Sequence, residues 1–405
     1  MTGDDRPRTA RLRDPFQESA FRRLWAARTV SQWGDVISTV TLALLVYELT
    51  GSGLGVTAVV AAEILPILLL APFAGALIDR LPRVRVMVAA DLGRAALVAL
   101  LVVTQDSLLL VFVVAAGTSA GTVFFNPAAG SVLPALVRRD HLVAANSGIW
   151  TAAVLSQIAL APLAGLVVVT AGFGWGFALN AASFVVSALL LRGLHVVAEP
   201  APLQRRTLVH DALEGARVLV ADRLLRALAV AQLLAALSAG ATSALLVVYA
   251  REQLQVDGRG YGTLLAAIGV GAVLGPLVLL RLVRDPRRPV FVFGPFALRG
   301  LVDLALAATV RLPVAATALV GYGIGTSTGA VTFTSLLQAE TEDRLRGRVL
   351  ASMDLLWQTG RLASLGVGGL LADTVGISAV YLLGGVLLLV AAAYGLGTAR
   401  GLQRR

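Results

Sequence analysis

The sequence contains no cysteine and no lysine among its 405 residues, and only 14% of the residues are charged. The absence of cysteine excludes disulfides, thiolate catalysis and iron–sulfur clusters. The absence of lysine excludes a P-loop, so an ATP-driven pump would need a partner to supply the nucleotide site. Hydrophobic residues make up 57% of the chain. A soluble protein of this length needs far more polar surface, so the composition indicates an integral membrane protein.

Twelve apolar segments are each long enough to cross the ~30 Å hydrocarbon layer of a bilayer as a helix. They form two sets of six, separated by the longest internal polar stretch of the chain. The predicted spans are approximately 24–47, 54–78, 86–104, 108–130, 148–169, 173–191, 226–249, 262–281, 290–310, 314–336, 350–371 and 377–398. The sequence therefore predicts an all-α, multi-pass protein with twelve transmembrane helices.

The arginines are distributed unevenly along this pattern. Of the 34 basic residues, 27 lie in the termini and connections on one predicted side of the membrane, three lie on the other side and four lie within spans. Arginines beside a membrane-spanning helix stay in the cytoplasm, so both termini are predicted to be cytoplasmic. A basic chain can also bind nucleic acid, but these arginines follow the connections and form no separate domain, so no nucleic-acid partner is expected.

The polar stretches divide the chain into predicted regions. These are a cytoplasmic tail 1–20, a six-helix bundle 21–192, a cytoplasmic linker 193–222 with an amphipathic helix, a second bundle 223–399 and a tail 400–405. Landmarks recur at a nearly constant spacing in the two bundles: Pro82 as Pro286, Arg94 as Arg299, and Trp150 as Trp357. This repetition predicts two pseudo-symmetric bundles.

A short basic connection follows the second span. Its motif residues are Gly75, Asp79, Arg80, Arg83 and Arg85. Asp79 can accept backbone N–H bonds at a helix N-terminus or pair with an arginine. The alternative is an ordinary cytoplasmic loop, which would need the arginines to set the topology but would not need glycine, aspartate and arginine in this order. The order resembles the loop between helices 2 and 3 of the major facilitator superfamily, with Pro82 where that family usually has glycine. The resemblance implies an inner gate here.

Further segments resemble the macrolide-efflux-like and siderophore-exporter-like branch of that superfamily. They are Phe21-Arg-Arg-Leu-Trp25, Ser31-Gln-Trp-Gly-Asp35, Leu45-Val-Tyr-Glu-Leu-Thr-Gly-Ser52, Phe125-Asn-Pro-Ala128 and Arg346-Gly-Arg-Val349. The fifth span, with Gln157, Pro162 and Gly165, resembles the antiporter motif, although several of its glycines are replaced. The resemblance implies a substrate site between the bundles near the middle of the membrane.

Ionisable residues inside the spans need a reason, because a charge there costs at least ~2.5–3.5 kcal/mol on insertion scales. Asp35, Glu63 and Asp303 are therefore candidate proton-coupling residues. A structural carboxylate, paired with Arg94 or with a backbone donor, is the alternative for Asp35. Polar and aromatic residues within other spans are candidate cavity or ion-pair residues: Arg94, Arg299, Asn126, Gln157, Gln232, Trp357, Gln358 and Arg361. Asp91 shares a helix face with Arg94, so a structural ion pair is favoured there.

The resemblance implies a secondary transporter in the bacterial inner (cytoplasmic) membrane. It would export an amphipathic or hydrophobic small molecule (a drug, a macrolide-like compound, a siderophore or another secondary metabolite) by alternating access, in exchange for protons. The alternatives are a metabolite uptake symporter and a non-transporting membrane sensor or scaffold. Catalytic residues, cofactors and metal sites are not expected, so the chain is predicted not to be an enzyme, and a monomer is expected.

The predicted topology can be tested with reporter fusions. A reporter fused after Gly53, Gln105, Asp257 or Asp373 should lie outside the cytoplasm. A reporter fused after Arg85, Gln204 or Arg346 should lie in the cytoplasm. The expectation follows from the arginine asymmetry. A reversed reading at any two of these positions would contradict the twelve-span topology.

Overall fold

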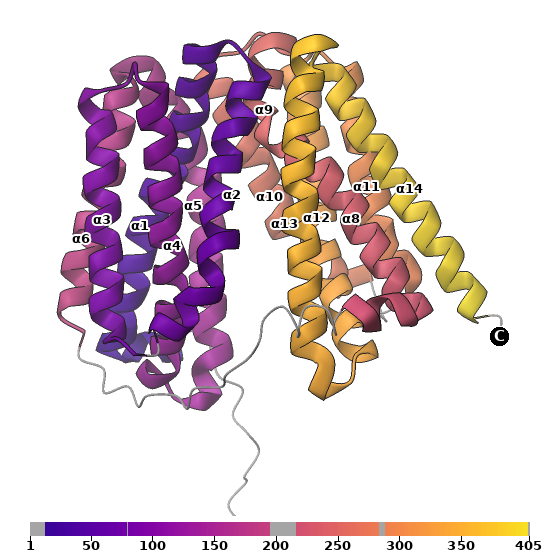
Figure 1. The fold of residues 1–405 in the computed structure, drawn as a ribbon, viewed down its shortest axis with the longest axis horizontal. Helices are drawn as coiled ribbons and strands as arrows, with labels where there is room; N and C mark the ends of the chain where they lie inside the picture. Colours follow the sequence, from indigo (N-terminus) through magenta and orange to yellow (C-terminus); the bar gives the residue numbers. More distant parts are fainter. Residues whose placement is uncertain (1–12, 79, 195–215, 283–287, 404–405) are drawn as a thin grey trace, which may run out of the picture.

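A computed structural model describes residues 13–78, 80–194, 216–282 and 288–403. Over these residues the chain contains helices and no strand, and twelve of the helices have 20 or more residues. The long helices of the N-terminal bundle are α1 (Ser19–Thr50), α2 (Gly53–Ile78), α3 (Arg83–Val103), α4 (Leu108–Leu136), α5 (Leu142–Ala171) and α6 (Phe173–Arg192). Those of the C-terminal bundle are α8 (Arg223–Ala244), α10 (Gly258–Leu282), α11 (Pro289–Ala308), α12 (Leu312–Glu340), α13 (Asp343–Thr374) and α14 (Ile377–Gln403). The predicted all-α fold of twelve helices is confirmed (Figure 1).

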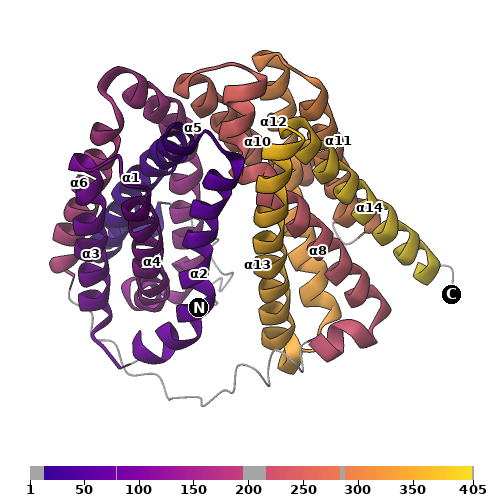
Figure 2. The same cartoon turned by 45° about the horizontal axis from the view of Figure 1, so that its top comes forward.

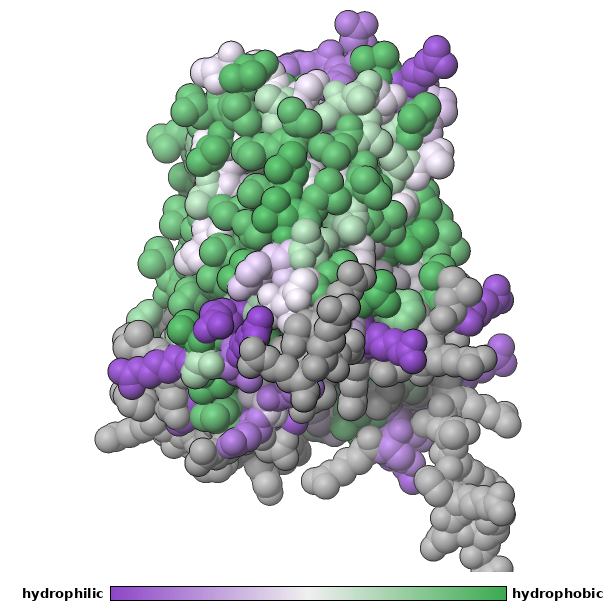
Figure 3. All heavy atoms as spheres, turned by 90° about the vertical axis from the view of Figure 1, so that its right-hand side faces the viewer, coloured by the Kyte–Doolittle hydropathy of each residue, from purple (hydrophilic) through white to green (hydrophobic). Residues whose placement is uncertain are grey.

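Eleven of these helices, within the described ranges, are long and apolar enough to cross a membrane. The twelfth, α13, carries Trp357, Gln358 and Arg361 in its middle. A helix that is polar at this depth must turn that face toward protein or a water-filled cavity. The face of the molecule seen in Figure 3 is a broad apolar band, with hydrophilic residues gathered toward its upper and lower ends.

Several helix ends differ from the predicted spans. Helix α4 continues through Pro127 and Pro134, because the backbone groups that proline frees can be satisfied by neighbouring helices. Helix α8 ends at Ala244 and is followed by α9 (Leu246–Val248) and the π-helix η3 (Tyr249–Gln253). Gln253 at the end of η3 donates to the carbonyls of Leu306, Ala307 and Thr309 at 3.0–3.2 Å, which caps the C-terminus of α11. The predicted amphipathic linker helix falls largely on 195–215, outside the described residues.

Packing between helices follows a two-fold pattern. In the N-terminal bundle α1 packs on α5 and α6, α3 on α4 and α6, and α2 on α4. In the C-terminal bundle α8 packs on α13 and α14, α11 on α12 and α14, and α10 on α12. The contacts between bundles are also equivalent, since α5 meets α10 and α2 meets α13. The predicted pseudo-symmetry of two six-helix bundles is thus confirmed (Figure 2).

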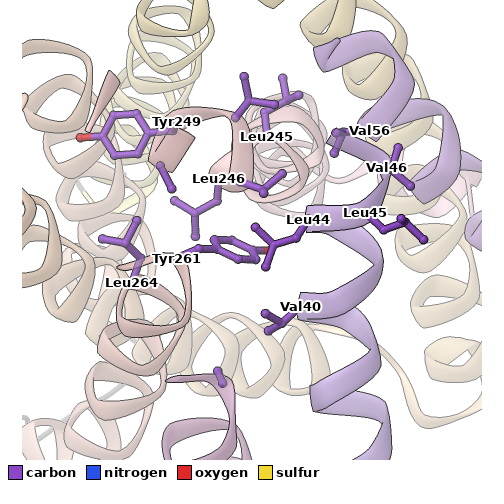
Figure 4. Packing of buried hydrophobic residues seen from close by; sticks show 14 of the residues in the cluster. Val40, Leu44, Leu45, Val46, Val56, Leu245, Leu246, Tyr249, Tyr261 and Leu264 are labelled. Atoms are coloured by element: carbon purple, nitrogen blue, oxygen red, sulfur yellow. The ribbon is translucent and has the colours of Figure 1, made fainter. Parts of the chain in front are cut away.

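Among the described residues, the buried apolar side chains form a core that is shared between the bundles at one end and separate at the other. We call the end with the start of α1 and the end of α14 the terminal end, and the opposite end the hairpin end. One core cluster draws residues from both bundles at the hairpin end, including Leu44, Leu245 and Tyr261. Figure 4 shows Tyr261 of α10 pointing toward Leu44 of α1. At the terminal end, by contrast, each bundle has its own cluster, around Phe21 and Met87 in one and Phe293 and Met353 in the other.

Polar contacts reinforce this closed hairpin end. Asp373, near the end of α13, accepts hydrogen bonds from the backbone N–H groups of Gly53 (2.6 Å) and Leu54 (3.2 Å) and from Ser52 Oγ (2.5 Å). A carboxylate of one bundle therefore caps the first turn of α2 in the other bundle. In addition, the Tyr47 hydroxyl donates to Glu252 Oε1 at 3.1 Å.

If the Asp373 cap holds the bundles together, the variant Asp373→Ala should loosen the hairpin end, because it removes a cap worth about 1 kcal/mol. The chain has no cysteine, so a single Tyr261→Cys substitution reports on the buried interface. We expect a membrane-impermeant maleimide to label Tyr261→Cys severalfold faster in the Asp373→Ala background.

Asp222→Ala provides the matched control, because Asp222 caps α8 through Leu224 and Leu225 N–H, both at 2.8 Å, within one bundle. Equal labelling rates in the two alanine backgrounds would mean that the Asp373 cap contributes only to the local stability of α2.

Candidate functional site

A cavity of about 240 Å³ lies inside the N-terminal bundle, which we call the N-terminal cavity. Its ionisable side chains come from three helices: Asp35 from α1, Glu63 from α2 and Arg94 from α3. Its other polar lining residues carry hydroxyl or amide groups, and are Ser38, Thr39, Thr118, Ser119, Thr122 and Asn180. The structure thus brings together three of the residues that the sequence singles out.

Arg94 is held by partners other than Asp35 and Glu63. It is 3% exposed and forms an ion pair with Asp91, which is fully buried. Its guanidinium also donates to Thr122 Oγ1 at 3.2 Å and lies over the rings of Phe125 and Phe184 at 4.9 and 4.3 Å. Ser187 Oγ donates to the second carboxylate oxygen of Asp91 at 2.6 Å. These contacts satisfy most of the buried pair, which fits the structural role favoured for Asp91.

Asp35 and Glu63 differ from Asp91 in having no such partner. Both are partly buried, and over the described ranges neither carboxylate lies within 4.0 Å of an arginine nitrogen. Arg361 of α13 attracts Glu63 electrostatically across the contact between the bundles, and Arg94 attracts Asp35. Carboxylates near a cavity but without a fixed cation can bind and release protons.

A second cavity, of about 290 Å³, lies in the C-terminal bundle and is called the C-terminal cavity. Gln232 of α8, Arg299 of α11 and Trp357 of α13 line it, together with Phe333. Arg299 donates from Nη2 to the Tyr322 hydroxyl at 2.9 Å and stacks over that ring at 4.8 Å. This cavity is more aromatic than the first.

Asp303 does not line either cavity. It is fully buried, and Ser238 Oγ donates to its Oδ2 at 3.3 Å. Oδ1 has no hydrogen-bond partner among the residues that the structure describes. Asp303 therefore has less direct access to water than Asp35 or Glu63.

The remaining predicted residues lie apart from the two cavities. Asn126 is exposed on α4, Gln157 is partly buried on α5 and Gln358 is partly buried on α13. In the basic connection, Arg80 and Arg85 are exposed and Arg83 donates to the Ser131 carbonyl at 3.4 Å. Gly75 lies near the end of α2, and Asp79 falls outside the described residues.

Pro162 and Gly165 contact the other bundle. A Cβ atom on Gly262 of α10 would lie 2.6 Å from Pro162 Cα, and Gly165 faces Gly258 so closely that no side chain fits between α5 and α10. The altered antiporter motif is thus part of the contact between bundles.

Sequence reasoning missed the hydroxyl groups of α4. Thr118, Ser119 and Thr122 share one helix face in an otherwise apolar run, and this spacing was the available signal. Ser119 Oγ donates to the Glu63 carbonyl at 2.5 Å, which ties α4 to α2 beside the cavity. Asn180, which lines the N-terminal cavity, was also missed, because nothing in its local sequence distinguishes it. Asp354 lines the C-terminal cavity and was overlooked as well, although an aspartate inside the predicted span 350–371 was an available signal.

The fold has clear counterparts among solved structures. An inward-facing bacterial homologue of the iron transporter ferroportin superposes with a TM-score of 0.73 at 17% identity, over 94% of this chain and 98% of that one. An inward-facing bacterial homologue of the lysosomal transporter Spinster gives 0.71 at 14% identity, over 96% and 98%. At these identities the likeness shows the fold alone.

The sequence profile of a family described as transmembrane secretion effector matches residues 12–400. The multidrug efflux pump Tap of Mycolicibacterium fortuitum is 30% identical over 381 residues, covering 89% of this chain and 90% of Tap. An uncharacterized MFS-type transporter of Mycobacterium tuberculosis is 29% identical over 398 residues, covering 90% and 88%. The enterobactin exporter EntS of Escherichia coli is 26% identical over 252 residues, covering 60% and 57%.

The fold and these relatives define a small-molecule transporter of the lipid bilayer rather than an enzyme. The chain belongs to the transmembrane secretion effector family of the major facilitator superfamily, which confirms the resemblance seen in the sequence.

The buried pair of Arg94 and Asp91 leads to a stability prediction. Arg94→Met should destabilise the protein by about 3 kcal/mol or more, because it leaves a buried carboxylate without its cation. Adding Asp91→Asn should restore part of the loss. Thermal unfolding in detergent measures both, with Arg22→Met as the control, since Arg22 is exposed. Equal unfolding temperatures for Arg94→Met and Arg22→Met would contradict this account.

Proposed function

We propose that this transporter exports an amphipathic or hydrophobic small molecule across the bacterial cytoplasmic membrane, in exchange for protons. The observation that carries the proposal is the N-terminal cavity, which Asp35 and Glu63 both line together with apolar and hydroxyl-bearing side chains. The names of Tap and EntS, a multidrug efflux pump and an exporter, support the outward direction.

Protons suit this site better than a metal cation does. Sodium or another hard cation needs several oxygen ligands at short distance. Among the described residues no group of three acidic or histidine side chains converges in this way. A carboxylate needs only alternating exposure to the two sides of the membrane to carry a proton. Asp35 and Glu63, neither held by a fixed ion pair in the described ranges, are the proposed carriers.

Alternating access is proposed from the way the bundles join. With the arginine-rich terminal end in the cytoplasm, the closed hairpin end corresponds to an inward-facing state. The outward-facing state then requires that the shared apolar cluster separate and that Asp373 release α2. A helix cap of about 1 kcal/mol is weak enough to break in each cycle.

Asp35→Asn tests the proton coupling. In everted membrane vesicles that are acidified inside, the wild-type protein should accumulate substrate, because inward proton movement in the cell corresponds to outward movement in these vesicles. Asp35→Asn should reduce accumulation to passive equilibration while still binding substrate, and Asp35→Glu should keep partial activity. Asp140→Asn is the control, since Asp140 is an exposed carboxylate that pairs with Arg138 outside the spans.

If Asp35→Asn vesicles still accumulate substrate against its gradient, Asp35 has a structural role and Glu63 becomes the proposed proton carrier. Accumulation in right-side-out vesicles instead would indicate uptake. Substrate binding without accumulation in either orientation would favour a sensor.

A further inference from the structure

Arg28 is an arginine within the membrane-spanning part of α1 that the proposed proton pathway does not use. It is the tenth residue of α1 and the fifth residue of the predicted span 24–47, so it lies ~6 Å along the helix from the start of that span. Its side chain is partly buried. A cation at this depth needs acceptors for its five N–H donors, from protein, water or a ligand.

The protein supplies no such acceptors within the described ranges. No carboxylate lies within 4.0 Å of the Arg28 guanidinium, and it makes no hydrogen bond. Other arginines of the same bundle are satisfied: Arg22 donates to the Phe16 and Gln17 carbonyls, and Arg23 donates to the Gly193 carbonyl at 2.6 Å. Arg94 has its ion pair with a buried aspartate. Arg28 therefore differs from its neighbours in being charged, partly buried and unpaired.

Helix geometry places Arg28 on the cavity-facing side of α1. Residues seven apart are nearly in line on an α-helix, so Arg28 shares a face with Asp35 and, one further turn away, with Thr39. Both of these line the N-terminal cavity. Arg28 lies about two turns from Asp35 toward the terminal end, where the bundles have separate cores.

The pseudo-symmetry supports this placement independently. The tenth residue of α8, which corresponds to Arg28 in the C-terminal bundle, is Gln232. Gln232 lines the C-terminal cavity beside Trp357 and Phe333. The same position on the two equivalent helices thus carries a polar donor, and one of the two is seen at a cavity wall.

We propose that Arg28 binds the anionic group of the transported molecule, so that the substrate is an amphipathic organic anion with an aromatic or apolar body. A guanidinium recognises carboxylate, phenolate or sulfonate groups through paired N–H donors. The aromatic walls of the C-terminal cavity, with Trp357 and Phe333, suit the body of such a molecule. This inference rests on the proposed export function and names its substrate class.

The electrical consequence is favourable to export. An inside-negative membrane potential drives an anion outward, so such a substrate moves down the electrical gradient as protons enter. A cationic substrate would have to leave against that potential.

The test compares two fluorescent probes that share one aromatic body, dansylglycine, an anion at neutral pH, and dansylcadaverine, a cation. Binding to the full-length protein in nanodiscs is followed by energy transfer from tryptophan to dansyl, with protein-free nanodiscs as background. The wild-type protein should prefer dansylglycine. Arg28→Gln should weaken its binding about tenfold or more and leave dansylcadaverine unchanged, since a hydrogen-bonded charge pair is lost.

Arg22→Gln is the matched control, because it removes an exposed arginine from the same helix, and it should change neither affinity. Arg28→Lys keeps the charge without the paired donors, so it should give an intermediate loss and covers the case in which Arg28→Gln does not fold. The proposal is overturned if the wild-type protein prefers dansylcadaverine or binds neither probe. Undiminished binding of dansylglycine by Arg28→Gln overturns it too.

The outcome separates this proposal from the export function itself. Suppose that everted vesicles accumulate dansylcadaverine in a proton-dependent manner while dansylglycine does not bind. This result would support the proposed export function and would show that the proposed anionic substrate class is wrong. If dansylglycine binds through Arg28 but no probe is transported under any gradient, the anion site stands and export is wrong.

Discussion

The structure depends on one constraint: inside the hydrocarbon layer every backbone polar group and every charge must be satisfied by the protein or face a cavity. The buried pair of Arg94 and Asp91 meets this constraint within the N-terminal bundle. Asp35 and Glu63 meet it in the other way, because both lie at a cavity wall. The constraint thereby separates charges that hold the bundle together from charges that remain available to a transported species.

The two bundles share a scaffold but not their chemistry. The seventeenth residue is Asp35 in α1 and Ala239 in α8, and the eleventh residue is Glu63 in α2 and Ile268 in α10. Both carboxylates of the N-terminal cavity therefore lack a counterpart in the C-terminal bundle. The C-terminal cavity has one carboxylate, Asp354 of α13, at a different helix position, and its aromatic walls are formed by Trp357, Phe296 and Phe333. The N-terminal cavity thus has two carboxylates among hydroxyl groups, and the C-terminal cavity has one among aromatic side chains. This difference supports a proton pathway in the N-terminal bundle and contacts with an apolar substrate body in the C-terminal bundle.

Sequence reasoning identified the fold because apolar length and arginine asymmetry are local properties that need no tertiary information. It also identified Asp35, Glu63 and Arg94 as candidate site residues, since a charge in an apolar run is visible in the sequence. It favoured Asp91 as the partner of Arg94, because the two residues share a helix face, and the structure shows that pair. It left a pair between Asp35 and Arg94 open, because that contact depends on how α1 is rotated within the bundle. The cap that Asp373 forms on Gly53 could not be predicted either, because it depends on tertiary packing between residues 320 positions apart.

The symmetry of the contacts between bundles bears on the origin of the molecule. The contact of α5 with α10 and that of α2 with α13 are the same contact, seen from either side of the pseudo-two-fold axis. Such a surface is self-complementary, as in an isologous dimer. A six-helix ancestor could therefore have assembled with a second copy of itself before duplication joined the two genes. Fusion would then have allowed equivalent positions to diverge, as Asp35 and Ala239 have and as Glu63 and Ile268 have.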